Sequence, residues 1–247
     1  MICRSFLSNM KLDILAVGAH PDDMELGCGG TIAKMVSKGK KVGIIDLTRG
    51  EMGTRGTAET RRQESSEASR ILGVSVRENL QFRDGFLVND EKHQLEVIKI
   101  IRKYQPDILI TNAVEDRHPD HGHTAKLVYD SQFLSGLRKL ETSLNGERQQ
   151  AWRPKHLFYC IQWNETKPDF VIDISDFLKV KVEACLAYKT QFYDEKSLEP
   201  VTLIATQNFT NSIVYRAENL GRLVGCDAGE GFTSPKWIGL KDFENFI

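Results

Sequence analysis

The segment LDILAVGAHPDD (residues 12–23) joins a strand-length apolar run to a cluster of one histidine and two aspartates. The run itself, residues 12–18, is apolar apart from Asp13. A strand that is apolar on both faces is typical of a parallel sheet covered by helices on both sides. The segment therefore predicts that the chain begins an α/β fold and that polar side chains follow its first strand directly.

Strand-length and helix-length stretches alternate outward from this segment. The expected strands are 12–18, 42–48, 78–82 and 107–112, and the expected helices are 31–40, 59–73 and 92–105. The helix at 59–73 is expected to end at Gly73, a common C-terminal stop. The alternation predicts a doubly wound, Rossmann-like fold with a mostly parallel sheet and helices on both faces. Two further strands (156–162, 169–174), two helices (175–189, 211–225) and a loop (146–154) are expected in the less regular remainder.

Length and composition indicate a globular protein of ordinary charge. The chain has 247 residues, 40% of them hydrophobic, and a formal net charge of −1, which argues against nucleic-acid or membrane-surface partners. No apolar run reaches the ~20 residues of a membrane span. Five cysteines without a C-x-x-C pattern argue against a disulfide framework and indicate a reducing cytoplasm. Residues 1–10 are interpreted as a leader, either an upstream start or a disordered segment, and residues 11–247 as a single domain.

Two polar clusters carry the candidate chemistry. AHPDDMELGCGG (19–30) follows the first expected strand, and EDRHPDH (115–121) follows the fourth. In an open α/β sheet, ligands bind beyond the carboxyl ends of the strands where the strand order reverses. In the common order 3-2-1-4-5, the first and fourth strands are neighbours there, so the clusters should face each other. Together they offer seven candidate side chains: His20, Asp22, Asp23, Glu25, His118, Asp120 and His121.

These residue types suit hydrolysis at a metal ion. A catalytic zinc typically has three nitrogen or oxygen ligands and one open position, and a separate carboxylate takes the proton from the attacking water. The adjacent Asp22 and Asp23 can divide these two tasks, because neighbouring side chains in a turn point in different directions. In the second cluster one histidine can bind metal while the other acts as an acid, with Asp120 fixing its ring.

Other readings of the clusters compete with a hydrolase. Histidines after strands are often surface residues, and paired aspartates often cap helices. A nucleotide-binding loop would need G-x-G-x-x-G, but Ile32 occupies the last position of the pattern that Gly27 begins. We expect the glycines at 27, 29 and 30 to let the chain turn tightly beneath a metal site. A non-catalytic metal-binding protein would have no need for Asp22 or His118 beside the ligands.

The paired motifs A-H-P-D-D-x-E (19–25) and H-P-D-H (118–121) resemble the LmbE-like (PIG-L) family of zinc N-deacetylases. The resemblance implies one zinc ion per chain, with iron(II) as the alternative in the cell. It also implies three metal ligands: His20, Asp23 and His121. Asp22 would be the general base, and His118, held by Asp120, would protonate the leaving amine or stabilise the oxyanion.

The resemblance also implies substrate-binding residues. Arg61, with Glu64 one helical turn later, matches a family pair in the second helix, and Asp84 would bind sugar hydroxyls. Ala228 occupies the region where many relatives carry a tyrosine that helps at the oxyanion. Relatives are often trimers or hexamers, so a homo-oligomer is expected.

The segment LTRGEMGTRGTAETRRQE (47–64) resembles the subgroup that deacetylates N-acetyl-α-D-glucosaminyl L-malate in bacillithiol biosynthesis. Malate carries two carboxylates, which arginine forks bind well. Arg55 and Arg117 are therefore expected to contact the aglycone, and Arg61 to contact either the sugar or the aglycone. The alternative substrate is another N-acetylglucosaminide, an inositol or chitobiose conjugate.

Overall fold

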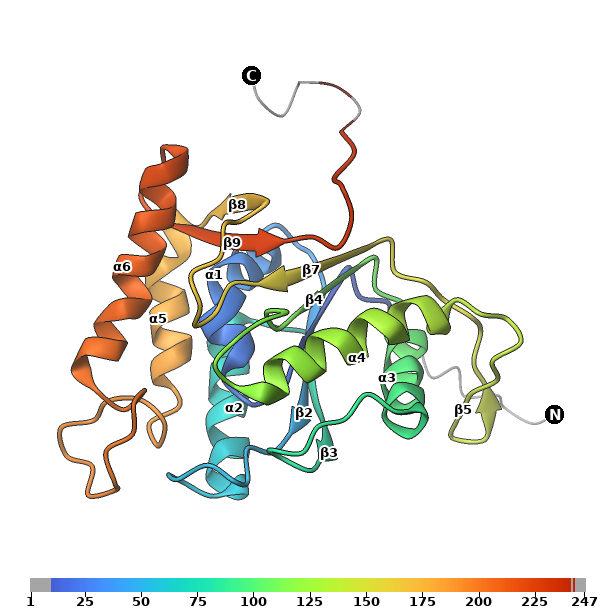
Figure 1. Ribbon diagram of the computed structural model, residues 1–247, viewed down its shortest axis with the longest axis horizontal. Coiled ribbons are helices and arrows are strands. Elements are labelled where there is room, and N and C mark those ends of the chain that lie inside the picture. Colours follow the sequence, from blue (N-terminus) through green and yellow to red (C-terminus); the bar gives the residue numbers. More distant parts are fainter. Residues whose placement is uncertain (1–9, 241, 243–247) are drawn as a thin grey trace.

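The computed structural model describes residues 10–240 and 242, and residues 1–9 of the expected leader lie outside this part. Its centre is a seven-stranded sheet in the order β3-β2-β1-β4-β7-β9-β8 (Figure 1). Parallel pairing joins five strands: β1 (Ile14–Gly18), β2 (Val42–Thr48), β3 (Val76–Phe82), β4 (Ile108–Thr111) and β7 (His156–Cys160). At one edge, β9 (Gly229–Thr233) and β8 (Phe170–Asp173) pair antiparallel. The predicted mostly parallel sheet is confirmed, including the adjacency of β1 and β4.

Helices cover both faces of the sheet (Figure 1). Leu15 and Val17 of β1 belong to the core beneath α3 (Glu91–Tyr104) and α4 (Pro119–Ser135). Ile14 and Ala16 alternate with them and belong to the core beneath α1 (Asp23–Ser37), α2 (Ala58–Leu72) and α5 (Leu178–Leu186). Because side chains alternate across a strand, a fully apolar β1 serves both cores. The last helix, α6 (Gln207–Val224), packs against β8, β9 and α5.

Helix boundaries follow local capping signals. Thr57 begins α2 with a capping box formed with Thr60, and Gly73 ends the helix at φ 70°, as predicted from sequence. Asp90 caps α3 by accepting a hydrogen bond from the backbone of His93. The expected helix at 175–189 is instead the short 3-10 turn η1 (Ser175–Phe177) followed by α5.

The helix α1 departs from the expected segment 31–40. It begins at Asp23 and is interrupted at Cys28, whose φ of −150° is not helical. The glycines at 27, 29 and 30 therefore lie within the helix, and the expected tight turn beneath the metal site is wrong. A Cβ on Gly27 would lie 2.8 Å from Cβ of Cys160, so this glycine lets α1 approach β7.

The interruption in α1 is bridged by residues from distant parts of the chain. The Glu230 carboxylate accepts hydrogen bonds from the backbone N–H groups of Gly30 (3.0 Å) and Thr31 (2.7 Å). Lys181 Nζ donates to the carbonyl of Leu26 (2.6 Å) and contacts Glu230. These buried groups satisfy the backbone atoms that a continuous helix would have paired internally.

Four elements were not predicted. The helix α4 was missed because the second motif occupies its first turn, and β9 because its sequence GEGFT is rich in glycine, which strands disfavour. A two-residue hairpin, β5 (Ser143–Leu144) and β6 (Glu147–Arg148), turns at Asn145 and Gly146 and extends into the expected loop 146–154. Among the helices of the described part of the chain, none combines the length and apolar character needed to cross a membrane.

Candidate metal centre and active site

The two predicted clusters meet at one cavity of about 270 Å³ beyond the carboxyl ends of β1 and β4. Eight of the predicted site residues line it: His20, Asp22, Asp23, Arg61, Asp84, Arg117, His118 and His121. Asp120 is fully buried behind them. Arg55 is not among the lining residues. The sequence motifs therefore define one site, and one predicted residue lies elsewhere.

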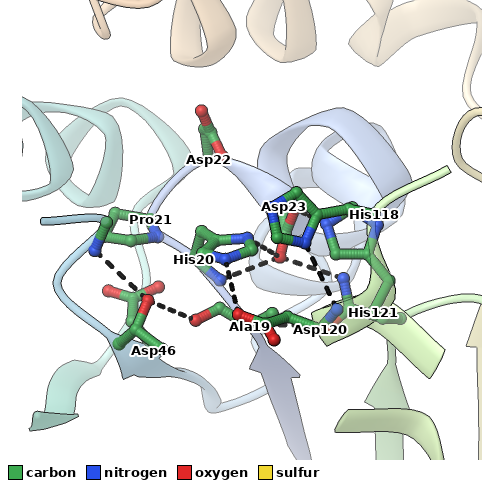
Figure 2. Close-up of polar contacts among 12 residues, drawn as sticks. Ala19, His20, Pro21, Asp22, Asp23, Asp46, His118, Asp120 and His121 are labelled. Carbon is green, nitrogen blue, oxygen red and sulfur yellow. Dashed lines mark hydrogen bonds and ion pairs between the residues drawn. The ribbon is translucent and has the colours of Figure 1, made fainter. Parts of the chain in front are cut away.

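The carboxylate of Asp23 lies between two imidazole rings (Figure 2). Its Oδ2 atom is 3.5 Å from His20 Nδ1, and its Oδ1 atom is 3.0 Å from His121 Nε2. Ring nitrogens of His20, His118 and His121 also lie within 4.8 Å of one another, close enough to share one ion. The three ligands expected from the resemblance are thus brought together, with His118 beside them.

Two amide side chains hold this carboxylate, and neither was predicted from the sequence. Asn112 Nδ2 donates to Asp23 Oδ2 (2.9 Å), and Gln162 Nε2 donates to Asp23 Oδ1 (3.2 Å). Asn112 Oδ1 also accepts the backbone N–H of Ala19 (2.8 Å). Each amide stands as the last residue of an expected apolar strand, 107–112 or 156–162. A polar side chain in that position was the available signal.

His20 and His121 each have a second ring nitrogen, the one farther from Asp23, and a carboxylate lies close to it. His20 Nε2 is 3.0 Å from Asp84 Oδ1 and 3.4 Å from Asp120 Oδ2. His121 Nδ1 is 3.2 Å from Asp116 Oδ2. Histidines that bind metal commonly donate their other ring N–H to a carboxylate, which orients the ring. Asp116 was not predicted, although it lies within the second polar cluster, residues 115–121.

These carboxylates also shift the imidazole pKa values. Burial alone would lower the pKa of both rings. For His20, hydrogen bonding to Asp120, Asp23 and Asp84 outweighs burial and raises the pKa well above its usual value. For His121, the nearby Asp23 and Asp116 raise the pKa to about 9 against burial. The surrounding carboxylates therefore favour a positive charge on or beside both rings, whether that of a proton or of a metal ion.

His118 is held by Asp120 through the backbone rather than through the carboxylate. His118 precedes α4 as its cap residue, and its Nδ1 accepts the backbone N–H of Asp120 (3.2 Å). The Asp120 carboxylate instead accepts the N–H groups of Gly85 (2.8 Å) and Leu87 (3.3 Å). The contact expected between the Asp120 side chain and this ring is thus replaced by one from the Asp120 backbone, because the ring caps the helix itself.

This hydrogen bond fixes the tautomer of His118. Because Nδ1 accepts, the proton of the neutral ring must be on Nε2. Burial, together with the positive charges of His20 and His121, lowers the pKa of His118. The ring is therefore a neutral N–H donor that faces the cavity.

The neighbouring Asp22 has a different environment from Asp23. Its φ of 116° lies in a region that residues with a Cβ rarely adopt, and Figure 2 shows its carboxylate directed away from the imidazoles. Arg61 Nη2 lies 3.2 Å from Asp22 Oδ2 and also donates to the carbonyl of Pro21. Burial raises the pKa of Asp22 to about 7, although the charge of Arg61 opposes it. The backbone at Asp22 thus directs the carboxylates of the two adjacent aspartates to different sides.

Arg55 does not contact the cavity, which corrects its predicted role in substrate binding. It is buried, and its Nη2 donates to Ser197 Oγ (2.6 Å) while its carbonyl accepts from Gln191 (2.9 Å). Glu64 likewise binds the backbone and hydroxyl of Thr190 rather than Arg61. Both residues fasten the segment after α5, and their sequence pattern alone did not reveal this.

The family model described as GlcNAc-PI de-N-acetylase (PIG-L) matches residues 15–131, which include both motifs. The diacetylchitobiose deacetylase of Thermococcus kodakarensis is 31% identical over 193 residues, which are 74% of this chain and 71% of that protein. The probable N-acetyl-alpha-D-glucosaminyl L-malate deacetylase 2 of Bacillus subtilis is 26% identical over 199 residues, 74% of this chain and 84% of that protein.

A solved structure supports the same fold. The crystal structure of the conserved protein TT1542 from Thermus thermophilus superposes with a TM-score of 0.82 and 37% sequence identity. The match covers 93% of this chain and 97% of that chain. The likeness therefore extends well beyond the motifs, to the strands and helices that position them.

Proposed function

The chain belongs to the PIG-L family of de-N-acetylases, and from that premise we propose that it hydrolyses the N-acetyl group of an N-acetylglucosamine conjugate with one zinc ion per chain. The observation that carries the proposal is the Asp23 carboxylate between the imidazoles of His20 and His121, beside a separately held Asp22. Ligands and a base of this kind are what a hydrolytic metal site requires.

The donor set fits a zinc ion. If His121 donates its Nδ1 proton to Asp116, its Nε2 is left free beside Asp23. If His20 donates its Nε2 proton to Asp84, its Nδ1 is left free beside the same carboxylate. Two imidazole nitrogens and one carboxylate are common ligands of catalytic zinc, with iron(II) as the alternative metal. When bound, the metal polarises the amide carbonyl and lowers the pKa of a water molecule.

Asp22 is the general base in this proposal. Its carboxylate lines the cavity, is held by Arg61, and has a pKa raised to about 7 by burial. A base with a pKa near the working pH can accept a proton from the attacking water and release it later in the same turnover. We therefore assign Asp22 both steps, first accepting the proton of water and then delivering it to the leaving amine.

His118 is assigned to the oxyanion rather than to the metal or to the amine. Ligation through Nε2 would put the ring proton on Nδ1, where it would face the N–H of Asp120. Protonation of the ring would create the same conflict between two donors. The neutral ring can instead donate its Nε2–H to the oxygen that becomes negative during attack on the amide.

N-acetyl-α-D-glucosaminyl L-malate is the proposed substrate. The resemblance of residues 47–64 and the likeness to the Bacillus subtilis protein support it. A chitobiose conjugate is the second candidate, because the chain is 31% identical to the diacetylchitobiose deacetylase. Arg61 and Asp84, which line the cavity beside Asp22 and His20, are proposed to contact the sugar.

The test is release of acetate and free amine from both conjugates by the zinc-loaded protein, with zinc content measured by elemental analysis. Equimolar acetate and amine, lost when the metal is chelated and restored by zinc, is the expected result. No release from either conjugate by a protein that holds stoichiometric zinc would refute the proposal. The cytoplasmic location and a trimeric or hexameric assembly belong to the same proposal, and light scattering tests the assembly.

A further inference from the structure

Almost every ionisable side chain that lines the cavity contacts another ionisable group. Arg61 pairs with Asp22 and Lys181 with Glu230, and the imidazoles of His20 and His121 contact the carboxylates of Asp84 and Asp116. Arg117 and Arg216 also line the cavity, yet neither guanidinium group has a hydrogen bond or an ion pair with any residue of 10–240 or 242. The described part of the site therefore keeps two positive charges without a partner.

The two arginines flank an aromatic wall of the cavity. The guanidinium of Arg117 lies 4.7 Å from the ring centre of Trp163, and Trp163 stacks on Phe209 of α6 with ring centres 5.7 Å apart. Arg216 follows Phe209 by about two helical turns, so both side chains are on the same face of α6. Aromatic rings and arginines side by side are well suited to bind a ligand that has both apolar and anionic parts.

The part of the cavity around Arg216 favours an anionic ligand. The cavity wall near Arg216 is largely apolar: Ile161, Ile204, Phe209, Ile213, Ala217 and Leu220. A half-buried cation beside apolar groups loses hydration that an anionic ligand can replace. The carboxylates that interact electrostatically with Arg216 are those of Asp116 and Glu165. Asp116 is already bound to His121 and the backbone N–H of Trp163, and Glu165 is exposed.

We propose that Arg117 and Arg216, together with Trp163, form a subsite for a carboxylate-bearing aglycone. This inference rests on the proposed function, because it assumes that the acetamido group lies among Asp22, Asp23 and His118. Asp116 connects the two parts, since its carboxylate contacts both His121 and the backbone of Trp163. Arg216 was not predicted from the sequence, and it is proposed to have the aglycone-binding role that was expected of Arg55.

The test compares binding of two products, glucosaminyl malate and methyl glucosaminide, to the zinc-loaded protein by calorimetry. The ratio of their Kd values measures the preference for the carboxylated aglycone. Arg216→Met should reduce this preference roughly tenfold, the effect of losing one charge-assisted hydrogen bond in a partly buried site. Arg117→Met should reduce it less, because Arg117 is exposed and solvent weakens its charge interactions. Arg216→Lys should retain part of the preference, since it keeps the charge and loses the fork.

The matched control is Arg222→Met on the same helix. Arg222 is exposed, donates to Asn219 (3.0 Å) and does not line the cavity, so its loss should not change the ratio. Equal ratios for Arg216→Met, Arg222→Met and the wild type would overturn the subsite. Amine release from the acetylated forms is measured separately. Its absence, with the binding preference intact, would refute the deacetylase assignment and leave the subsite standing.

Discussion

The first motif contains three buried acids, Asp22, Asp23 and Glu25. The two aspartates differ from the glutamate in the groups that their carboxylates contact. Asp22 and Asp23 line the cavity, and Asp23 contacts two imidazoles. Glu25 is fully buried and does not line it, and its Oε1 binds Arg77 Nη1 (2.5 Å) and the hydroxyl of Tyr188 (3.1 Å).

Burial of a charge therefore does not by itself identify a functional residue. An arginine is a permanent cation, so Arg77 fixes Glu25 in one state. An imidazole can lose its proton and bind a metal ion in its place. The histidines beside Asp23 can therefore exchange a proton for a metal ion. In sequence, all three acids were candidates, and roles were expected only for Asp22 and Asp23. The structure separates them by the partner and by access to a cavity.

The largest expected effect comes from removing the base. Asp22→Asn should lower kcat roughly a thousandfold, because an amide cannot accept the proton of water. Zinc content should stay close to the wild type, since Asp22 is not a proposed ligand. Amine release and elemental analysis check both parts. A variant that loses its zinc would move Asp22 into the ligand group and break the contrast with Asp23.

Glu25→Gln should show the opposite pattern. Removing one charge of a buried pair typically costs about 3 kcal/mol, and among the described residues Arg77 would keep only Asp46 (2.8 Å) as its acidic partner. Urea unfolding at saturating zinc should reveal this loss, while kcat of the folded fraction changes little. Asp46→Asn is the matched variant in the same network. Loss of turnover with unchanged stability would place Glu25 in the chemistry and contradict the comparison.

Asp116→Asn tests the carboxylate that orients a proposed ligand. Residues that hold a metal-binding histidine typically contribute roughly ten- to a hundredfold to metal affinity. Competition with a zinc chelator should therefore show weaker zinc binding, and added zinc should restore most of the turnover. Unchanged affinity would mean that the contact between His121 and Asp116 is not part of the metal site.

The smallest effect is expected from an exposed ion pair. Glu59 binds Arg62 on α2 (2.7 Å), and both side chains are largely exposed. Because solvent screens such pairs, Glu59→Gln should change neither the midpoint of urea unfolding nor turnover measurably. A clear loss of stability would show that an ion pair stabilises this protein even when it is exposed, so that burial would not explain the difference from Glu25.

Much of the fold was predictable where local pattern and tertiary role agree. β2 was expected at 42–48 and has those bounds, because a strand buried on both faces is apolar throughout. By contrast, β9 was missed: its glycines and Glu230 serve contacts with α1 and α6 that no local pattern encodes.

The site was predictable to the same extent. The motif residues that meet at the cavity were identified from their positions after two strands. The roles of Asn112, Gln162 and Asp116 depend on neighbours that only the folded chain supplies. Arg55 was placed wrongly because the path of the loop after β2, which turns it toward Ser197, cannot be read from arginine spacing.

The interruption in α1 sets the order in which the protein can be completed during synthesis. The motif helix leaves the ribosome early, yet its Gly30 and Thr31 N–H groups depend on Glu230 and its Leu26 carbonyl on Lys181. A nascent chain that ends before residue 229 should therefore leave these amides open to hydrogen exchange, even with β1, β2 and β4 already paired. The part of the chain that carries the chemistry is translated first and secured last.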